Sequence, residues 1–464
     1  MLARLLVLIG LLFLSFGAVA QPQWQSLPGA REQMIEEPVF GGRAWVFEAG
    51  QRDRPAVVLV HGLGDLGAGT WQALVPVLAQ RYHVLTFDLP GFGRSTKSNQ
   101  LYSPENYVAF IRFVTQRYLG RPFKLVGHSM GGAISLRYAA THPQDVSQLL
   151  LVDAAGILHR SVYTQFLSQA GVKMLPSVYP GQGGALTDLA GHVMRTLDRV
   201  NFDADVVLRT PALRQSILGG TPTQIAAMAL VQDDFSRLIP KVDVPTLIVW
   251  GEQDPIAPLR TGKLLASAIP GARLRVLPGL RHMPMQEDAE LFNGVVAEEL
   301  AHDAATLTRL RARSAYALAP ELPRNERVGR CSAGADQTFR GDYLAIEING
   351  CRNVRLVDVR TTKLTVNGSE VEIENSHILG QDVGIRAQGS ELKITGGSVR
   401  GDVAIELDRS RADLAGVRVS GGQATLRAVG RQTSEAVLSV SWLVRDGQEW
   451  AWHAVRVLRP NENL

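Results

Sequence analysis

One stretch of the sequence decides the fold: residues 123–132, which read FKLVGHSMGG. Its first four residues are mostly apolar and predict a strand, while the residues from Met130 onward predict a helix over 130–141. Gly127 and Gly131 flank Ser129 and leave room for a sharp turn between the two elements. Such a turn exposes the serine hydroxyl beside the free N–H groups that begin the helix. We therefore expect Ser129 to be a nucleophile.

Apolar runs on both sides of this stretch predict the rest of the sheet. They cover residues 56–60, 82–88, 149–153, 245–251 and 272–277. Continuous apolar runs are typical of parallel strands that are buried on both faces. Helical patterns lie between them, over 71–80 and 104–118 among others. The fold class is therefore α/β, a doubly wound and mostly parallel sheet, preceded by a hairpin around Gly41-Gly42.

A long segment, 154–244, separates the fourth and fifth of these strands. Its pieces read as helices over 163–174, 186–200 and 223–232, and a structureless loop of this length is implausible. We expect a helical cap inserted above the strand ends. Its apolar side chains are candidates to line a substrate pocket, Phe166, Met174 and Tyr179 foremost. The alternative is that they pack the cap onto the sheet.

The sequence changes character after the helices predicted over 288–315. Residues 318–327 (LAPELPRNER) are the predicted linker, so the first domain would span 21–317 and a second domain 328–464. In the second domain, strand-like units begin at positions 346, 364, 385, 405 and 425, a period near 20 residues. Stacked parallel turns bury the apolar face that one unit cannot bury alone. We predict a short parallel β-helix; the alternative is an antiparallel sandwich. Asp446-Gly447 predicts a terminal hairpin.

The first twenty residues have the features of a secretory signal peptide. Arg4 precedes an apolar run, and Ala18-Val19-Ala20 is a small-residue cleavage signal. The expected localisation is export, to the periplasm or the outside, with no transmembrane segment after cleavage. The alternative is an uncleaved anchor. The chain's two cysteines, Cys331 and Cys351, are expected to form a disulfide in that compartment, although two buried thiols are the other possibility.

A serine hydroxyl needs a base, and the base needs a group that orients it. Asp254 follows the strand predicted over 245–251, and His282 follows the strand over 272–277. The chain order Ser, Asp, His fits a sheet of this class. We expect His282 to take the Ser129 proton and Asp254 to orient the ring. Asp153, which also ends a strand, is the rival for the orienting role.

Two backbone N–H groups are expected to stabilise the oxyanion, each by about 3 kcal/mol. One belongs to Met130, the residue after the nucleophile. The other belongs to Leu63, in the loop His61-Gly62-Leu63-Gly64. His61 is expected to shape this loop through its side-chain hydrogen bonds; the alternative is a further catalytic histidine. His128 is expected to be a packing or supporting residue.

These segments together resemble the α/β-hydrolase superfamily over residues 39–300. The resemblance rests on His61-Gly62-Leu63-Gly64, on the turn Asp88-Leu89-Pro90-Gly91-Phe92-Gly93-Arg94-Ser95 and on Gly127-His128-Ser129-Met130-Gly131-Gly132. It implies the α/β-hydrolase fold with Ser129, Asp254 and His282 as the catalytic triad. Asp88 and Arg94 are expected to fix the turn that contains them. The resemblance does not reach the C-terminal domain.

Composition excludes several other classes. Hydrophobic residues make up 45% and charged residues 20%, which excludes a disordered, collagen-like or disulfide-dense chain. The net charge of +4 comes without a basic stripe, so no nucleic acid partner is expected. The histidines show no shared metal-ligand spacing, and we expect neither a metal nor a cofactor.

The sequence thus favours an exported serine hydrolase that cleaves an ester or thioester of an apolar acyl group, with a small-molecule or lipid ester as substrate. One alternative is an envelope-associated scaffold whose repeat domain binds polysaccharide. Another is a C–C bond hydrolase that uses the same triad. An intact triad favours an enzyme, because a scaffold could lose any member of it.

Overall fold

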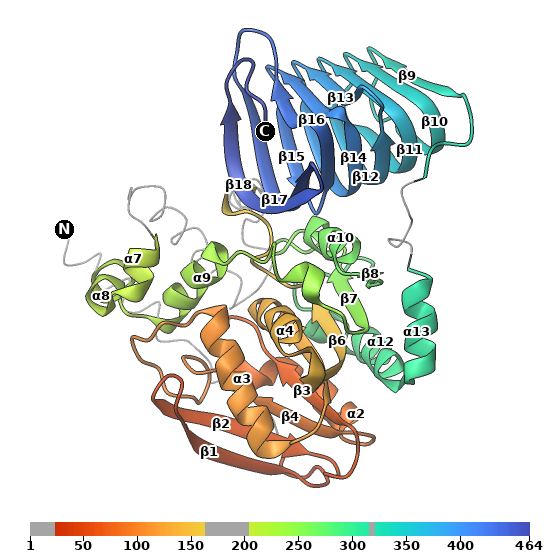
Figure 1. Cartoon of the computed structure of the whole chain (residues 1–464). Helices are drawn as coiled ribbons and strands as arrows, with labels where there is room; N and C mark the ends of the chain where they lie inside the picture. Colours follow the sequence, from red (N-terminus) through yellow and green to blue (C-terminus); the bar gives the residue numbers. More distant parts are fainter. Residues whose placement is uncertain (1–23, 163–203, 315–320) are drawn as a thin grey trace, which may run out of the picture.

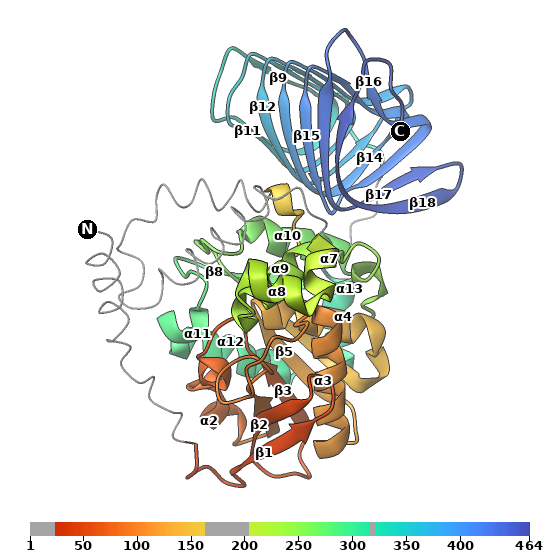
Figure 2. The ribbon, with the colours of Figure 1, turned by 90° about the vertical axis from the view of Figure 1, so that its left-hand side faces the viewer.

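The structure is a computed structural model that describes residues 24–162, 204–314 and 321–464 (Figure 1). The predicted signal segment and the pocket candidates Phe166, Met174 and Tyr179 lie outside the described residues. Two bodies are visible: an α/β domain, and a stack of β-strands formed by the C-terminal part of the chain (Figures 1 and 2). Residues 321–327 of the predicted linker contain no helix or strand.

The α/β domain is built on an eight-stranded sheet of order β1-β2-β4-β3-β5-β6-β7-β8. Its strands are β1 (Arg31–Glu37), β2 (Gly42–Ala49), β3 (Ala56–Val60), β4 (His83–Phe87), β5 (Phe123–His128), β6 (Val146–Val152), β7 (Thr246–Gly251) and β8 (Arg273–Leu277). The first two strands form the predicted antiparallel hairpin, and the strands from β4 to β8 pair in parallel. Every residue of β3, β4 and β7 is buried. The expected fold class is confirmed.

Helices cover both faces of this sheet, which makes it doubly wound. The longer ones are α3 (Pro104–Tyr118), α4 (Met130–Thr141), α10 (Leu259–Ala268), α12 (Ala289–Ala301) and α13 (Ala304–Ala312). Alternate residues of β3 enter different apolar clusters: Val58 joins the cluster of α3 and α4, whereas Val57 joins that of α12. Because successive side chains of a strand point to opposite faces of the sheet, β3 contributes to the apolar cores on both faces.

The helix predicted over 71–80 is shorter than expected. A 3-10 helix, η1, ends at Trp71 (Gly67–Trp71), and the α-helix α2 covers only Leu74–Leu78. Pro76 explains the late start, because a residue without an N–H group is tolerated only in the first turn of a helix.

The described part of the predicted cap is helical. It contains α7 (Ala204–Arg209), α8 (Pro211–Leu218), α9 (Pro222–Gln232) and a 3-10 turn, η3 (Ile239–Lys241). A proline stands in the first turn of α8 and α9, where it fixes the backbone for a helix start. The helix α9 matches the one predicted over 223–232. The remaining predicted cap helices fall outside the described residues.

The C-terminal β domain consists of ten strands. They are β9 (Val328–Ser332), β10 (Thr338–Asn349), β11 (Val354–Asn367), β12 (Glu370–Leu379), β13 (Val383–Gln388), β14 (Glu391–Asp408), β15 (Arg411–Ala415), β16 (Arg418–Ala428), β17 (Ser434–Arg445) and β18 (Gln448–Leu458). All pairs among β9 to β17 are parallel. This pairing excludes the antiparallel sandwich and bears out an all-β domain of stacked parallel strands.

The observed register reproduces the predicted repeat. Ile346 pairs with Leu364, Leu364 with Ile385, and Ile385 with Ile405. The last unit begins one residue later than predicted, because Ile405 pairs with Leu426 and not with Thr425. The register shifts between Gly401 and Val403, where β16 accommodates one extra residue.

A row of serines inside the β domain satisfies backbone groups from one turn to the next. The hydroxyls of Ser369, Ser390, Ser410 and Ser434 accept the N–H groups of Cys351, Ser369, Ser390 and Ser410, at 2.8–3.2 Å. These donors are buried and would be costly if left unpaired. The recurrence of serine at this place in successive turns is visible in the sequence, and the sequence analysis overlooked it.

Two local predictions in the β domain are confirmed. The final strands β17 and β18 form an antiparallel hairpin in which Arg445 pairs with Gln448. Asp446 and Gly447 both have positive φ, as a two-residue hairpin turn requires. Cys331 and Cys351 form a disulfide between β9 and the loop after β10.

Candidate active site

Ser129 occupies the sharp turn between β5 and α4. Its φ of 54° and ψ of −121° are unusual for a residue with a side chain, so the surroundings must hold the backbone in place. The Ser129 N–H group donates to Val152 O at 2.9 Å, and the N–H group of Ala155 donates to Ser129 O at 3.2 Å. The end of β6 and the loop that follows it therefore fix the backbone of Ser129.

Glycines on both sides of Ser129 are required by close backbone contacts. A Cβ at Gly131 would lie 2.3 Å from His61 O and 2.4 Å from Val60 O. A Cβ at Gly127 would lie 2.3 Å from Gly131 O. Neither position has space for a side chain, so the turn that presents Ser129 depends on both glycines.

The structure brings together the three residues predicted as the triad. His282 Nε2 lies 3.0 Å from Ser129 Oγ, and His282 Nδ1 lies 2.8 Å from Asp254 Oδ2. All three side chains are at most 7% exposed. They come from residues 129, 254 and 282, after β5, β7 and β8, which end at the same edge of the sheet. In this arrangement Nδ1 carries a proton toward the carboxylate and Nε2 can accept the serine proton.

The carboxylate of Asp254 is held by its own loop. Its Oδ1 atom accepts the N–H groups of Ile256 at 2.7 Å and Ala257 at 2.9 Å. The carbonyl oxygen of Ala257 in turn accepts the indole N–H of Trp250. These bonds leave Oδ2 directed to the imidazole, which is the geometry of an orienting acid.

Asp153, the rival acid, takes a different position. It directly follows β6 and has a φ of 44°, and its Oδ1 accepts the N–H group of Gly251 at 2.8 Å. Its other oxygen, Oδ2, is buried and has no hydrogen-bond partner among the described residues. Burial, and then the charge of Asp254, raise the pKa of Asp153 well above its usual range. The geometry therefore favours Asp254 as the residue that orients His282.

The loop predicted to form the oxyanion site lies directly against the nucleophile. A Cβ at Gly62 would be 2.8 Å from Ser129 Cβ. His61 shapes this loop as expected: its Nε2 accepts the N–H group of Leu89, and its Nδ1 donates to Gly62 O. Leu63 is the next residue, and Met130 begins α4 beside Ser129. Their N–H groups remain the predicted oxyanion donors.

His128 supports the imidazole from behind. Its Nε2 lies 2.8 Å from the carbonyl oxygen of His282, and the two rings are 5.0 Å apart. Burial lowers the pKa of His128 to about 3, so this ring is neutral and donates to the carbonyl. His128 thus fixes the backbone of His282, which agrees with the supporting role expected from the sequence.

Asp88 and Arg94 fix the turn that contains them, as expected. Asp88 accepts the N–H group of Ala68 at 2.7 Å, and it also accepts the N–H and Nε–H groups of Arg94. The Arg94 guanidinium stacks on Trp45 at 3.1 Å from the ring centre.

Two kinds of feature are absent from the described residues. None of their helices has the length and apolar character needed to cross a membrane. In the same part of the chain, no group of three or more His, Cys, Asp or Glu side chains is arranged to hold a metal ion.

Comparison with known proteins gives a family. A family model described as "alpha/beta hydrolase fold" matches residues 55–289, a little over half of the chain. Monoacylglycerol lipase abhd6-B of Xenopus laevis is 28% identical over 250 residues, covering 51% of this chain and 72% of that protein. The 2-hydroxy-6-oxo-6-(2'-aminophenyl)hexa-2,4-dienoic acid hydrolase of Metapseudomonas resinovorans is 26% identical over 251 residues, covering 51% and 80%.

Among solved structures, an esterase from Exiguobacterium antarcticum is 20% identical and superposes with a TM-score of 0.44. That match covers 59% of this chain and 100% of the esterase.

Proposed function

The chain belongs to the alpha/beta hydrolase family, and on this premise we propose that it hydrolyses an ester or thioester of an apolar acyl group through an acyl-enzyme on Ser129. The observation that carries the proposal is the continuous hydrogen-bond chain from Ser129 Oγ through His282 to Asp254. The monoacylglycerol lipase among its relatives supports an acyl ester as the substrate.

The first half of the proposed reaction forms the acyl-enzyme. Ser129 Oγ attacks the carbonyl carbon while His282 Nε2 takes its proton, and Asp254 stabilises the imidazolium that results. The N–H groups of Met130 and Leu63 stabilise the oxyanion. As the intermediate collapses, the bond to the alcohol or thiol breaks and His282 returns the proton to the leaving group.

The second half releases the acid. A water molecule gives its proton to His282 Nε2 as its oxygen attacks the acyl carbon. The bond to Ser129 Oγ then breaks, and the imidazolium returns the proton to the serine. The enzyme ends in its starting protonation state, and no further reactant is required.

The test uses nitrophenyl esters of graded acyl length together with a fluorophosphonate probe. Ser129→Ala should lose labelling and lose turnover by about 10⁴-fold or more, because triad members act as a unit. The matched control is Ser135→Ala, a buried serine of α4 whose hydroxyl has no hydrogen-bond partner in the described part of the chain. It should keep turnover within a few-fold. Wild-type protein that neither turns over esters nor takes the label contradicts the proposal.

A C–C bond hydrolase is the second candidate, and one comparison favours it. A relative at 26% identity hydrolyses a 2-hydroxy-6-oxo-dienoic acid, and the same triad can serve that reaction. Measuring kcat/KM for such a dienoic acid beside the nitrophenyl esters separates the two. A value that exceeds those of all the esters favours the C–C hydrolase.

We also propose that the protein is exported. The apolar segment at the N-terminus, with its small-residue signal Ala18-Val19-Ala20, motivates this. The Cys331–Cys351 disulfide fits an oxidising compartment. Cell fractionation and mass spectrometry of the mature protein provide the test, with Gln21 expected as the first residue. Export is contradicted if the protein stays in the cytoplasm and still carries residues 1–20.

A further inference from the structure

The C-terminal β domain is packed against the α/β domain and not merely tethered to it. Val437, Val440 and Trp442 of β17 belong to the same apolar cluster as α4 and α10. The helix α10 contacts β14 directly. Both views of the chain show α10 beneath the stack of strands (Figures 1 and 2). A continuous apolar core fixes the orientation of the two domains.

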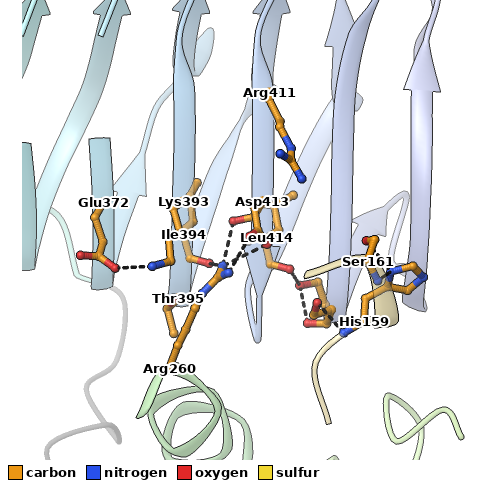
Figure 3. Close-up of polar contacts among 12 residues, drawn as sticks. His159, Ser161, Arg260, Glu372, Lys393, Ile394, Thr395, Arg411, Asp413 and Leu414 are labelled. Carbon is orange, nitrogen blue, oxygen red and sulfur yellow. Dashed lines mark hydrogen bonds and ion pairs between the residues drawn. The ribbon is translucent and has the colours of Figure 1, made fainter. Parts of the chain in front are cut away.

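Arg260, in the first turn of α10, is the polar centre of this contact. Its Nε donates to Thr395 Oγ1 at 2.8 Å, and its Nη1 donates to Asp413 Oδ2 at 2.6 Å. Its Nη2 donates to Ile394 O, Asp413 O and Asp413 Oδ1 at 3.0–3.1 Å. Figure 3 shows the guanidinium reaching from α10 to these acceptors on β14 and β15.

Burial and geometry both make the Arg260–Asp413 contact costly to break. The Arg260 side chain is only 8% exposed, and its fork meets Asp413 in a two-point ion pair. Every acceptor belongs to the β domain, so the guanidinium would lose all these partners if the β domain moved away. Breaking one side of a buried pair leaves an uncompensated charge, which is costly.

Arg260 is close in sequence to the groups that hold the catalytic acid. Only Pro258 and Leu259 separate it from Ala257, whose N–H group donates to Asp254 Oδ1. The acid loop therefore runs directly from Asp254 into the turn of α10 that the β domain holds. A shift at Arg260 would be transmitted through two residues to the donors of Asp254.

A second attachment holds the nucleophile's side of the site. The N–H group of His159 donates to Ser439 Oγ of β17 at 2.9 Å. His159 lies in the loop after β6, the same loop in which the N–H group of Ala155 donates to Ser129 O. The β domain thus contacts both loops that support triad residues (Figure 3).

We infer that the C-terminal β domain is a positioning element of the hydrolase, and that Arg260 is a positioning residue that couples the β domain to Asp254. The inference rests on the proposed function, because it concerns the acid of that triad. It gives the β domain a role within the catalytic unit that does not require a separate ligand. Its removal would weaken the chemical step more than substrate binding.

The test compares variants of the full-length chain. Arg260→Met and Asp413→Asn each break the contact from one side, and Arg260→Lys keeps the charge but loses the two-point geometry. The matched control is Arg386→Met, whose ion pair with Glu406 at 2.7 Å joins β13 and β14 within the β domain. Measurements are kcat, KM, the pH profile of kcat/KM, and amide hydrogen exchange in α10.

Arg260→Met and Asp413→Asn should lower kcat about 10–100-fold, since small displacements of a catalytic group cost about that much, while KM stays within a few-fold. The acid limb of the pH profile should move to lower pH, because a carboxylate held close favours the protonated ring. Exchange in α10 should increase. The double variant should be no worse than either single one. Arg260→Lys should recover part of kcat, and the control should match wild type.

The inference is overturned if exchange in α10 increases while kcat and the pH profile remain those of wild type. Unchanged exchange in α10 also overturns it, because Arg260 would then not hold the helix. Failure of the proposed function looks different: wild-type protein would show no turnover and no probe labelling. The exchange measurement would still report whether the β domain holds the loop of Asp254.

Discussion

Asp153 and Asp254 lie at the ends of two neighbouring strands, β6 and β7, and their carboxyl groups accept different backbone N–H groups. Asp153 Oδ1 accepts the N–H group of Gly251, the last residue of β7. Asp254 faces the N–H groups of Ile256 and Ala257 as well as the ring of His282. Asp153 Oδ2 has no hydrogen-bond partner among the described residues. Burial and the charge of Asp254 raise the pKa of Asp153, so this carboxyl group favours its protonated form.

Asp153→Asn should stabilise the protein at neutral pH. Burial and Asp254 raise the pKa of Asp153, so folding at pH 7 requires a carboxyl group to take up a proton. This cost is absent below the ordinary pKa of an aspartate, about 3.9, and grows as the pH rises above it. The asparagine avoids the cost and keeps an oxygen that can accept the N–H group of Gly251. A gain of about 1 kcal/mol would raise Tm by about 2–4 °C.

The measurement is Tm of both proteins between pH 3.5 and 8, together with kcat. The difference in Tm should shrink toward the acid end, and kcat of Asp153→Asn should stay within a few-fold. Asp153→Ala is the control, because it leaves the N–H group of Gly251 unpaired and should lower Tm. A loss of kcat beyond about 100-fold in Asp153→Asn would show that the carboxyl group itself is needed.

Two glycine substitutions should have opposite effects on stability. Gly131→Ala places a methyl group 2.3 Å from His61 O, against backbone that cannot easily move, and should cost about 1–3 kcal/mol and most of the activity. Gly294 is an exposed residue of α12, and a Cβ there meets nothing within 4 Å. Gly294→Ala should therefore increase the free energy of unfolding by about 0.5–1 kcal/mol, because alanine has the higher helix propensity. Thermal unfolding and ester turnover of both variants check this. Equal Tm shifts in the two would contradict it.

Mild acid should weaken the contact between the domains. His159 and His453 lie with their rings 5.0 Å apart where the loop after β6 meets β18. Burial, and next His453, lower the pKa of His159 to about 4, and burial lowers the pKa of His453. Arg160 acts in the same direction on His159, whereas Asp413 and Asp234 oppose the shift.

Both pKa values are lower in the folded state, so the stabilisation is present above the ordinary histidine pKa of about 6.5 and is lost as the pH falls toward 4. Because His159 is partly exposed, we expect a loss of only about 1 kcal/mol, or about 2–4 °C in Tm, between pH 7 and 5. His453→Phe keeps a ring without a titrating group and should reduce this loss. The same decline in Tm for both proteins would contradict the assignment.

The disulfide should stabilise the first turn of the β domain without affecting catalysis. Cys331 and Cys351 close a loop with a sequence separation of 20, for which a stabilisation of about 3 kcal/mol is typical. The disulfide joins β9 to the loop after β10, at the end of the strand stack remote from β17. The double variant Cys331→Ala/Cys351→Ala should unfold at lower denaturant concentration and keep kcat. A loss of kcat in the folded variant would contradict the separation of roles.

Many residues of the candidate site could be predicted because they belong to short, recognisable sequence motifs. Gly127 and Gly131 around Ser129 specify the turn, since only glycine fits the close backbone contacts found there. The apolar runs specify strands, and parallel strands bring their carboxyl ends to one edge. Asp254 and His282 follow two such strands, so their meeting with Ser129 follows from topology. The repeat near 20 residues likewise anticipated the pairing of Ile346, Leu364, Ile385 and Ile405.

Other features depend on contacts that no local pattern encodes. The choice between Asp153 and Asp254 follows from which carboxylate reaches His282 Nδ1, and both aspartates end a strand in the sequence. From the sequence, Arg260 would be expected on the exposed face of an amphipathic helix. In the structure it is buried against Asp413, 153 residues away.

The sequence by itself determined the α/β fold, the meeting of Ser129 with His282 and Asp254, the parallel repeat of the C-terminal domain and the hairpin that ends it. These features rest on spacing within a segment and on the rules of strand connection. Only the tertiary structure decided which aspartate faces His282 and where the C-terminal β domain attaches. Both depend on burial and on the directions of side chains that meet across long sequence separations, and these arise only when the separate elements pack together.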